Sequence, residues 1–149
     1  MIPIGLSIGD EMKNYTVAIC VDDGLGLMLF GKRQSRDRVL ISEFIESNGD
    51  KNIYISPFSR LLFEPHPSVR ISDDPFAEAE EGSALFIENI KLDGKIDDIG
   101  TLIIYRWNRK YPSDVKLTLD PLKCGFKLSS KKDFAGSSHE KITKEIYVR

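Results

Sequence analysis

The sequence is poor in the residues that build metal centres and disulfide frameworks. Its 149 residues include two cysteines and two histidines, in neither C-x-x-C nor H-x-H spacing. We therefore expect no tightly bound metal ion. Cys20 and Cys124 are more than a hundred positions apart, which favours reduced thiols that pack as small apolar side chains over a disulfide.

Long apolar runs and an excess of charge are also absent. No run reaches the ~20 apolar residues that a membrane-spanning helix needs. The first residues lack the basic segment and apolar core of a signal peptide, and a net charge of −2 gives no general attraction to nucleic acid. These absences predict a cytoplasmic protein without a membrane partner.

The composition is that of one ordinary globular domain, with 41% hydrophobic and 30% charged residues. Residues 1–11 are loosely patterned, whereas Met12 would be a natural beginning for a protein that opens on a strand. We expect residues 1–11 to be an N-terminal extension and residues 12–149 to form a single α/β domain. The oligomeric state stays open, and a homo-oligomer is one of the alternatives.

Strand-like and helix-like segments alternate through the first two thirds of the chain. Buried strands are predicted at 15–21, 52–55, 84–87 and 101–107, a brief strand at 69–71, and helices at 35–47, 56–63 and 73–81. Residues 27–30 fit either a strand or a covering loop. Residues 114–119, 125–129 and 142–148 alternate between polar and apolar, and the last two predict an antiparallel pair. The pattern predicts a three-layer α/β domain with a mixed, mostly parallel central sheet and an antiparallel C-terminal edge.

Arginines are concentrated where the first strand-like region gives way to the first helix. Arg33, Arg36 and Arg38 lie near a helix start, where cations are mildly unfavourable. A bound anion would explain them, although solvated surface charges would too. Ser35 fits the N-cap of this helix and is a candidate ligand-binding residue. Asp37 is either a catalytic carboxylate or a surface acid that pairs with a nearby arginine.

A second polar cluster lies in the glycine-started loop at 136–141. Ser137 and Ser138 are candidate ligand-binding residues, and His139 is a candidate acid–base catalyst. The same residues are common in ordinary turns, so that interpretation stays open. His66, between two prolines, fits an exposed loop.

Residues 107–111 mix aromatic and basic side chains, as base-stacking surfaces do. A strand end followed by a loop explains the same residues more simply. Because the charge of the whole chain gives no support, we do not expect nucleic-acid binding.

The order of elements and several residues resemble the dihydrofolate reductase family. The tail carries most of the resemblance, with Leu-Ile-Ile-Tyr at 102–105, Gly-Phe-Lys-Leu-Ser-Ser at 125–130 and Lys-Glu-Ile-Tyr-Val-Arg at 144–149. At the front, residues 18–22 followed by Gly24 and Gly26 resemble the first strand and mobile loop of the family. The resemblance implies a dihydrofolate reductase-like fold and places Asp37 where the family keeps its substrate-binding acid.

The departures from the family lie at its binding sites. Arg33-Gln34-Ser35 stands in place of Leu-Pro-Trp, and residues 56–59 (Ser-Pro-Phe-Ser) replace the Gly-Arg-Lys/Arg-Thr cofactor motif. Glu88-Asn89 replaces a pair of glycines that lets the backbone approach the cofactor pyrophosphate, and a carboxylate there would repel it. We therefore expect no NADPH cofactor.

The sequence thus predicts a protein that binds a small anionic ligand near the first helix. The ligand would bear phosphate or resemble a pterin or nucleotide. One alternative is a divergent NADPH-dependent reductase. Another is an RNA-binding or phosphodiester-cleaving protein that uses His139 and the arginines. Whether the protein is an enzyme is left open.

Overall fold

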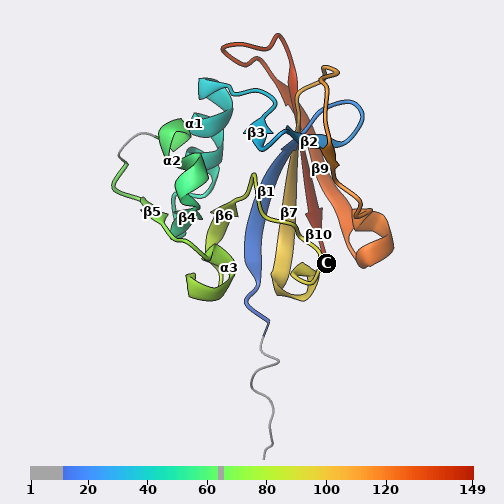
Figure 1. The fold of residues 1–149 in the computed structure, drawn as a ribbon. Coiled ribbons are helices and arrows are strands. Elements are labelled where there is room, and N and C mark those ends of the chain that lie inside the picture. The colour runs from blue at the N-terminus through green and yellow to red at the C-terminus, as the bar shows by residue number, and fades with distance from the viewer. Residues whose placement is uncertain (1–11, 64–65) are drawn as a thin grey trace, which may run out of the picture.

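A seven-stranded mixed sheet forms the centre of the molecule. The computed structural model describes residues 12–63 and 66–149, so the expected N-terminal extension lies outside the described residues. The strand order is β5-β4-β6-β1-β7-β10-β9 (Figure 1). The strands from β5 to β7 are parallel, and β10 runs antiparallel to both β7 and β9. The bounds are β1 Tyr15–Val21, β4 Ile53–Ile55, β5 Val69–Ile71, β6 Ala84–Phe86, β7 Ile99–Arg106, β9 Lys127–Phe134 and β10 Ile142–Val148.

Short helices and a small second sheet cover the central sheet. The α-helices are α1 Arg38–Ser47, α2 Arg60–Phe63 and α3 Pro75–Glu78, and the 3₁₀ helices are η2 Pro57–Ser59, η3 Ile96–Asp98 and η4 Pro121–Cys124. The small antiparallel sheet has the order β3-β2-β8, from β2 Gly26–Leu29, β3 Lys32–Arg33 and β8 Val115–Lys116. These elements complete the predicted α/β architecture, including its mostly parallel sheet and antiparallel edge.

The strand β1 is buried on both faces, as its almost wholly apolar sequence predicts. Alternate residues point to opposite sides of a strand. Tyr15, Val17 and Ile19 therefore join one core cluster, while Ala18 joins another on the opposite face.

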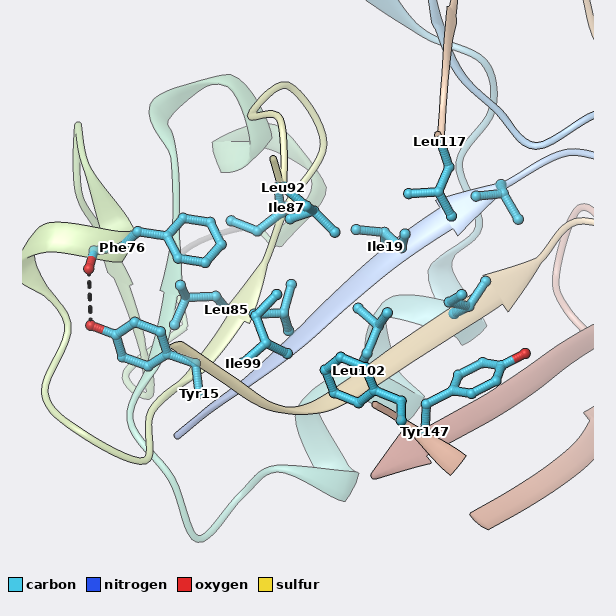
Figure 2. Close-up of a cluster of buried hydrophobic side chains, with 14 of the residues drawn as sticks. Tyr15, Ile19, Phe76, Leu85, Ile87, Leu92, Ile99, Leu102, Leu117 and Tyr147 are labelled. Carbon is cyan, nitrogen blue, oxygen red and sulfur yellow. Dashed lines mark hydrogen bonds between the residues drawn. The ribbon is translucent and has the colours of Figure 1, made fainter. Parts of the chain in front are cut away.

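The first cluster packs against α3 and the loops beyond it (Figure 2). The ring of Tyr15 contacts that of Phe76 edge to face, and its hydroxyl donates to the backbone carbonyls of Phe76 and Ala79. Burial of this ring thus leaves no polar atom without a partner.

The second cluster packs against α1 and α2. Leu40, Ile41 and Phe44 form the buried face of α1, as their helical spacing predicts. The Phe44 ring contacts those of Phe63 and Phe86 edge to face at centroid distances of 6.1 and 5.3 Å. The first helix is thereby fixed on the sheet.

The start of this helix differs from the sequence prediction. Asp37, not Ser35, is the N-cap, with φ −154° and ψ 124°, and its side chain accepts from the backbone N–H groups of Val39 and Leu40. Both residue types cap helices well. The choice is decided by tertiary contacts of Asp37, which local sequence does not reveal.

The strands predicted at 114–119 and 125–129 differ most in length from the observed strands. Only Val115–Lys116 of the predicted strand at 114–119 pairs with β2, whereas β9 extends to Phe134 along β10. Within 12–63 and 66–149, no helix is long and apolar enough to cross a membrane.

Candidate functional site

The loop at 136–139 wraps around the carboxylate of Asp37. Its Oδ1 accepts from the backbone N–H of Ser137 at 2.9 Å, and its Oδ2 from that of Ser138 at 2.7 Å. The hydroxyl of Ser137 lies 3.2 Å from Oδ1 and also accepts the backbone N–H of Arg38. The two polar clusters of the sequence therefore form one site, which joins the start of α1 to the approach to β10.

Glycine is required at position 136 because this loop approaches the carboxylate closely. A Cβ atom there would lie 2.3 Å from Oδ2 of Asp37 and 2.8 Å from Cδ1 of Ile142. Any side chain would displace the loop. The loop therefore has a glycine at position 136 because there is no room for a side chain.

Asp37 is held in its ionised form. Burial by itself would raise the pKa of this carboxyl. The backbone N–H groups of Ser137 and Ser138, the ring of His139 and the backbone N–H of Leu40 outweigh burial and hold the pKa well below its usual range. The site therefore contains a permanent buried negative charge.

His139 lies between this carboxylate and two hydroxyl groups. Its Nδ1 is 3.0 Å from Oδ2 of Asp37, and its Nε2 is 3.0 Å from both Oγ of Ser35 and the hydroxyl oxygen of Tyr111. An ionised carboxylate can only accept, so Nδ1 of a neutral imidazole carries the proton. Nε2 is then the basic nitrogen that faces the two hydroxyls.

Trp107 lies against the face of the imidazole, with ring centroids 4.5 Å apart and planes 24° apart. Trp107 is 4% exposed, so it does not offer the open stacking surface that residues 107–111 suggested as an alternative. Tyr111 and Trp107 both contact His139, and the sequence did not predict that they belong to this site. The feature of the sequence that could have indicated them is the pair of aromatic residues, four positions apart, at the end of a buried strand.

The three candidate arginines differ in their partners. The guanidinium of Arg33 forms an ion pair with Glu88, with Nε 2.9 Å from Oε2 and Nη2 3.0 Å from Oε1. Nη2 also donates to the carbonyl of Phe58. Arg36 and Arg38 are exposed and form no ion pair within 12–63 and 66–149.

The first backbone N–H groups of α1 are not available to bind an anion. The N–H groups at 38, 39 and 40 are taken by Ser137 and Asp37. An anion near Arg36 and Arg38 would therefore contact side chains and no helix donors.

The two segments that replace the cofactor motifs are hydrogen-bonded to each other. Oγ of Ser59 donates to Oε1 of Glu88 at 2.7 Å, and Oγ of Ser56 donates to Oδ1 of Asn89 at 3.2 Å. The start of η2 is thus joined to the loop after β6. The polar side chains of these two segments are therefore hydrogen-bonded within the protein.

A second buried carboxylate shapes the loop after β1. Asp22 accepts from the backbone N–H groups of Gly24, Gly26 and Tyr111. Burial would raise the pKa of Asp22, but these bonds and one from Gln34 lower it. Asp22 therefore ties the loop after β1 to the segment that carries Tyr111.

Two hollows adjoin the site. A cleft of about 570 Å³ lies between the loop after β6 and the segment around β8. A smaller hollow of about 10 Å³ is bordered by Ser35, Arg33 and Trp107. The two share Leu27, Ile87 and Glu88 as lining residues. The two hollows are therefore neighbours in the structure.

Gln34 presents a polar atom without a partner beside the smaller hollow, which it lines. Its Nε2 donates to the carbonyl of Pro112 at 3.1 Å and contacts Oδ2 of Asp22 at 3.4 Å. These two acceptors fix the orientation of the amide, and Oε1 is buried without a hydrogen bond to any residue of 12–63 and 66–149. A ligand N–H would satisfy it.

In the part of the chain that the structure describes, no three His, Cys, Asp or Glu side chains gather in a possible metal site. Cys20 and Cys124 are free thiols there.

No family model matches the sequence, and no curated protein is significantly similar to it. The chain is similar in structure to dihydrofolate reductase from Enterococcus faecalis, solved in complex with NADP(H) and RAB-propyl. The match has a TM-score of 0.65 at 10% sequence identity and covers 93% of this chain and 97% of the reductase. At that identity the likeness concerns the fold, and the resemblance seen in the sequence is confirmed at that level. This protein therefore has a dihydrofolate reductase-like fold.

Proposed function

We propose that this protein binds a small ligand with an anionic or oxygen-rich group in the cleft between the loop after β6 and the segment around β8, without ordinary NADPH-dependent reductase activity. The observation that carries the proposal is the cleft of about 570 Å³, a size typical of small-molecule sites. Its lining combines apolar residues with a few charged ones. The apolar ones include Ile19, Leu27, Ile87, Leu92 and Leu117, and the charged ones include Glu88, Lys91 and Lys116.

Arg33 is the residue that would bind the oxygen-rich group. Its Nε and Nη2 are used by Glu88 and Phe58, but Nη1 makes no hydrogen bond with the described residues. Arg33 lines the smaller hollow, which adjoins the cleft. The ring-like body of the ligand would fill the cleft, with a carboxylate, phosphate or carbonyl oxygen on Nη1.

The hydrogen bonds from Ser59 to Glu88 and from Ser56 to Asn89 argue against a dinucleotide. A pyrophosphate would have to displace these bonds and approach the carboxylate of Glu88, whose side chain is 12% exposed. Repulsion between like charges in a partly buried site opposes that approach. The runner-up function, a divergent NADPH-dependent reductase, is disfavoured for this reason.

The proposal is tested by screening small anionic ring compounds, such as pterin-6-carboxylate and nucleoside monophosphates, for a rise in melting temperature. The variant Val115→Trp fills the cleft, because Val115 lines it and is 37% exposed. Leu122→Trp is the matched control, because Leu122 is exposed and does not line the cleft. A ligand that stabilises the wild type and Leu122→Trp but not Val115→Trp supports the proposal. Equal stabilisation of all three would place the ligand elsewhere and overturn it.

The role of Arg33 has its own variant. Arg33→Lys keeps the positive charge for Glu88 and removes the Nη1 donors. We expect about tenfold weaker binding of the ligand, as the loss of one charged hydrogen bond predicts. Unchanged affinity would remove Arg33 from the site.

A further inference from the structure

Ser35, His139 and Asp37 form a continuous hydrogen-bonded series that the ligand-binding proposal does not use. Oγ of Ser35 lies 3.0 Å from Nε2 of His139, and Nδ1 of His139 lies 3.0 Å from Oδ2 of Asp37. We propose that Ser35 is a nucleophile, activated by His139 and Asp37, that attacks the carbonyl carbon of a small ester or thioester. The same three roles of nucleophile, base and orienting acid recur on unrelated folds and are recognised by geometry.

The orienting acid and the base are fixed in place. Asp37 is 3% exposed and His139 is 4% exposed. The backbone N–H groups of Ser137 and Ser138 hold the carboxylate from one side, and Trp107 holds the imidazole ring flat. The proton on Nδ1 therefore faces Asp37, and Nε2 is left to accept the proton of a hydroxyl.

The nucleophile is accessible, unlike its partners. Ser35 is half-buried and lines the smaller hollow together with Arg33. The volume of that hollow, about 10 Å³, suits a single small group such as a carbonyl. Part of this inference rests on the proposed function, because the body of the acyl substrate would occupy the adjoining cleft.

The groups around the hollow match the needs of acyl transfer. Oγ of Ser35 attacks the carbonyl carbon while its proton moves to Nε2 of His139. The carbonyl oxygen becomes an oxyanion, which the guanidinium of Arg33, a residue that lines the same hollow, would stabilise. The imidazolium that forms lies between the carboxylate of Asp37 and the face of Trp107, and both favour a cation.

The remaining steps return the site to its starting state. The leaving alcohol or thiol takes the proton from Nε2 as its bond to the carbonyl carbon breaks, which leaves an acyl group on Oγ. A water molecule then gives its proton to Nε2 and attacks the acyl carbon. The acid departs, and Oγ of Ser35 takes the proton back. No oxidant, reductant or metal ion is required.

Tyr111 is the competing partner of the imidazole. Its hydroxyl oxygen is also 3.0 Å from Nε2, and it donates to Oγ of Ser35 at 3.4 Å. If the hydroxyl of Tyr111 were the only one to hydrogen-bond with Nε2 of His139, Ser35 would not be activated as a nucleophile. The test must therefore separate the two hydroxyls.

The experiment uses a fluorophosphonate, whose phosphorus accepts a serine oxygen and releases fluoride, with the site of labelling located by mass spectrometry. The full chain should acquire one adduct, on Ser35. Ser35→Ala should abolish it, whereas Ser129→Ala, at an exposed position on β9, should leave it unchanged. Tyr111→Phe should retain it. His139→Gln should slow labelling about a hundredfold, the usual contribution of a general base.

Three results would overturn the proposal. These are no adduct on the wild type, an adduct on another residue, or labelling that Tyr111→Phe abolishes. His139→Gln could unfold the chain, and for that reason Ser35→Ala and Tyr111→Phe carry the decision. Ser35→Ala separates the two proposals, because Ser35 is not among the residues that line the cleft: the substitution should abolish labelling yet retain the rise in melting temperature with the ligand. Hydrolysis of p-nitrophenyl acetate, lost in Ser35→Ala, supplies the second readout.

Discussion

Asp37 and His139 are 102 residues apart in the sequence, yet Oδ2 of one lies 3.0 Å from Nδ1 of the other. The pair joins the start of α1 to the loop before β10, so one carboxylate caps a helix, orders a loop and orients an imidazole. This arrangement makes both the stability and the chemistry of the site depend on a single side chain.

Replacement of Asp37 by asparagine should lower the free energy of unfolding by about 3 kcal/mol. The amide has one acceptor oxygen and would turn its N–H groups toward the donors of Ser138 or His139. The change is measured by urea denaturation. Asp50→Asn is the control, because the Asp50 side chain is 80% exposed, and it should change stability by less than about 0.5 kcal/mol. Equal effects of the two substitutions would contradict the role of Asp37.

Stability should fall as the pH drops below about 4, the usual pKa of an aspartate in an unfolded chain. The pKa of Asp37 is lower in the folded chain than in the unfolded chain. Between these two pKa values the carboxyl is protonated in the unfolded chain and ionised in the folded chain. The stabilisation is therefore fully present above pH ~4 and is lost as the pH falls toward the lower folded value. Urea midpoints at several pH values measure this.

Asp37→Asn should flatten this acid dependence without abolishing it, because the pKa values of Asp22 and Glu43 are also lowered. Burial would raise the pKa of Glu43, and a hydrogen bond from Lys144 leads the effects that lower it. A variant with an unchanged acid dependence would show that Asp37 is not held ionised.

Phe44→Ala should cost about 3–5 kcal/mol of stability, as truncation of a buried aromatic residue does. Phe44 is 0% exposed and fixes α1 against Phe63 and Phe86. Leu61→Ala, at a side chain that is 73% exposed, is the control and should have little effect. A loss under about 1 kcal/mol for Phe44→Ala would mean that α1 is held mainly by its polar contacts.

Gly136→Ala should destabilise the protein by about 2 kcal/mol, since the new methyl group would collide with Asp37 and Ile142. It should also loosen the hydrogen bond between Asp37 and His139, seen as a shift of the imidazole proton resonances in an NMR spectrum. Gly49→Ala is the control, because its Cβ would meet only backbone oxygens at 3.6 and 3.7 Å. Similar losses in both variants would remove the special role of Gly136.

The fold was largely predictable from the sequence, and the site only in part. The β-branched run of β1 and the helical spacing of Leu40, Ile41 and Phe44 specify burial directly, so the central sheet and α1 follow. The α/β order and antiparallel tail agree with the structure. The helix start was misplaced because Ser35 and Asp37 both have capping side chains, and the contacts that select Asp37 come from residues 137–139.

The partners of the candidate residues were not predictable in the same way. Arg33 pairs with Glu88, which lies 55 residues away, and no local pattern specifies that pair. The same holds for Tyr111, whose hydroxyl reaches His139 across 28 residues. The gathering of Arg33, Arg36 and Arg38 in the sequence suggested one anion site, and this stays a prediction, although Arg33 is paired with Glu88 while Arg36 and Arg38 are exposed.

The most direct test of the account is a fluorescence titration of the wild-type protein with NADPH. Hydrogen bonds join Ser59 to Glu88 and Ser56 to Asn89 in the two segments that differ from the cofactor motifs of the family that the sequence resembles. We predict no saturable binding at sub-millimolar NADPH, alongside stabilisation of the protein by a small anionic ligand that Val115→Trp abolishes. Saturable binding of NADPH in the micromolar range, about −8 kcal/mol of binding free energy, would contradict the account and favour a working reductase.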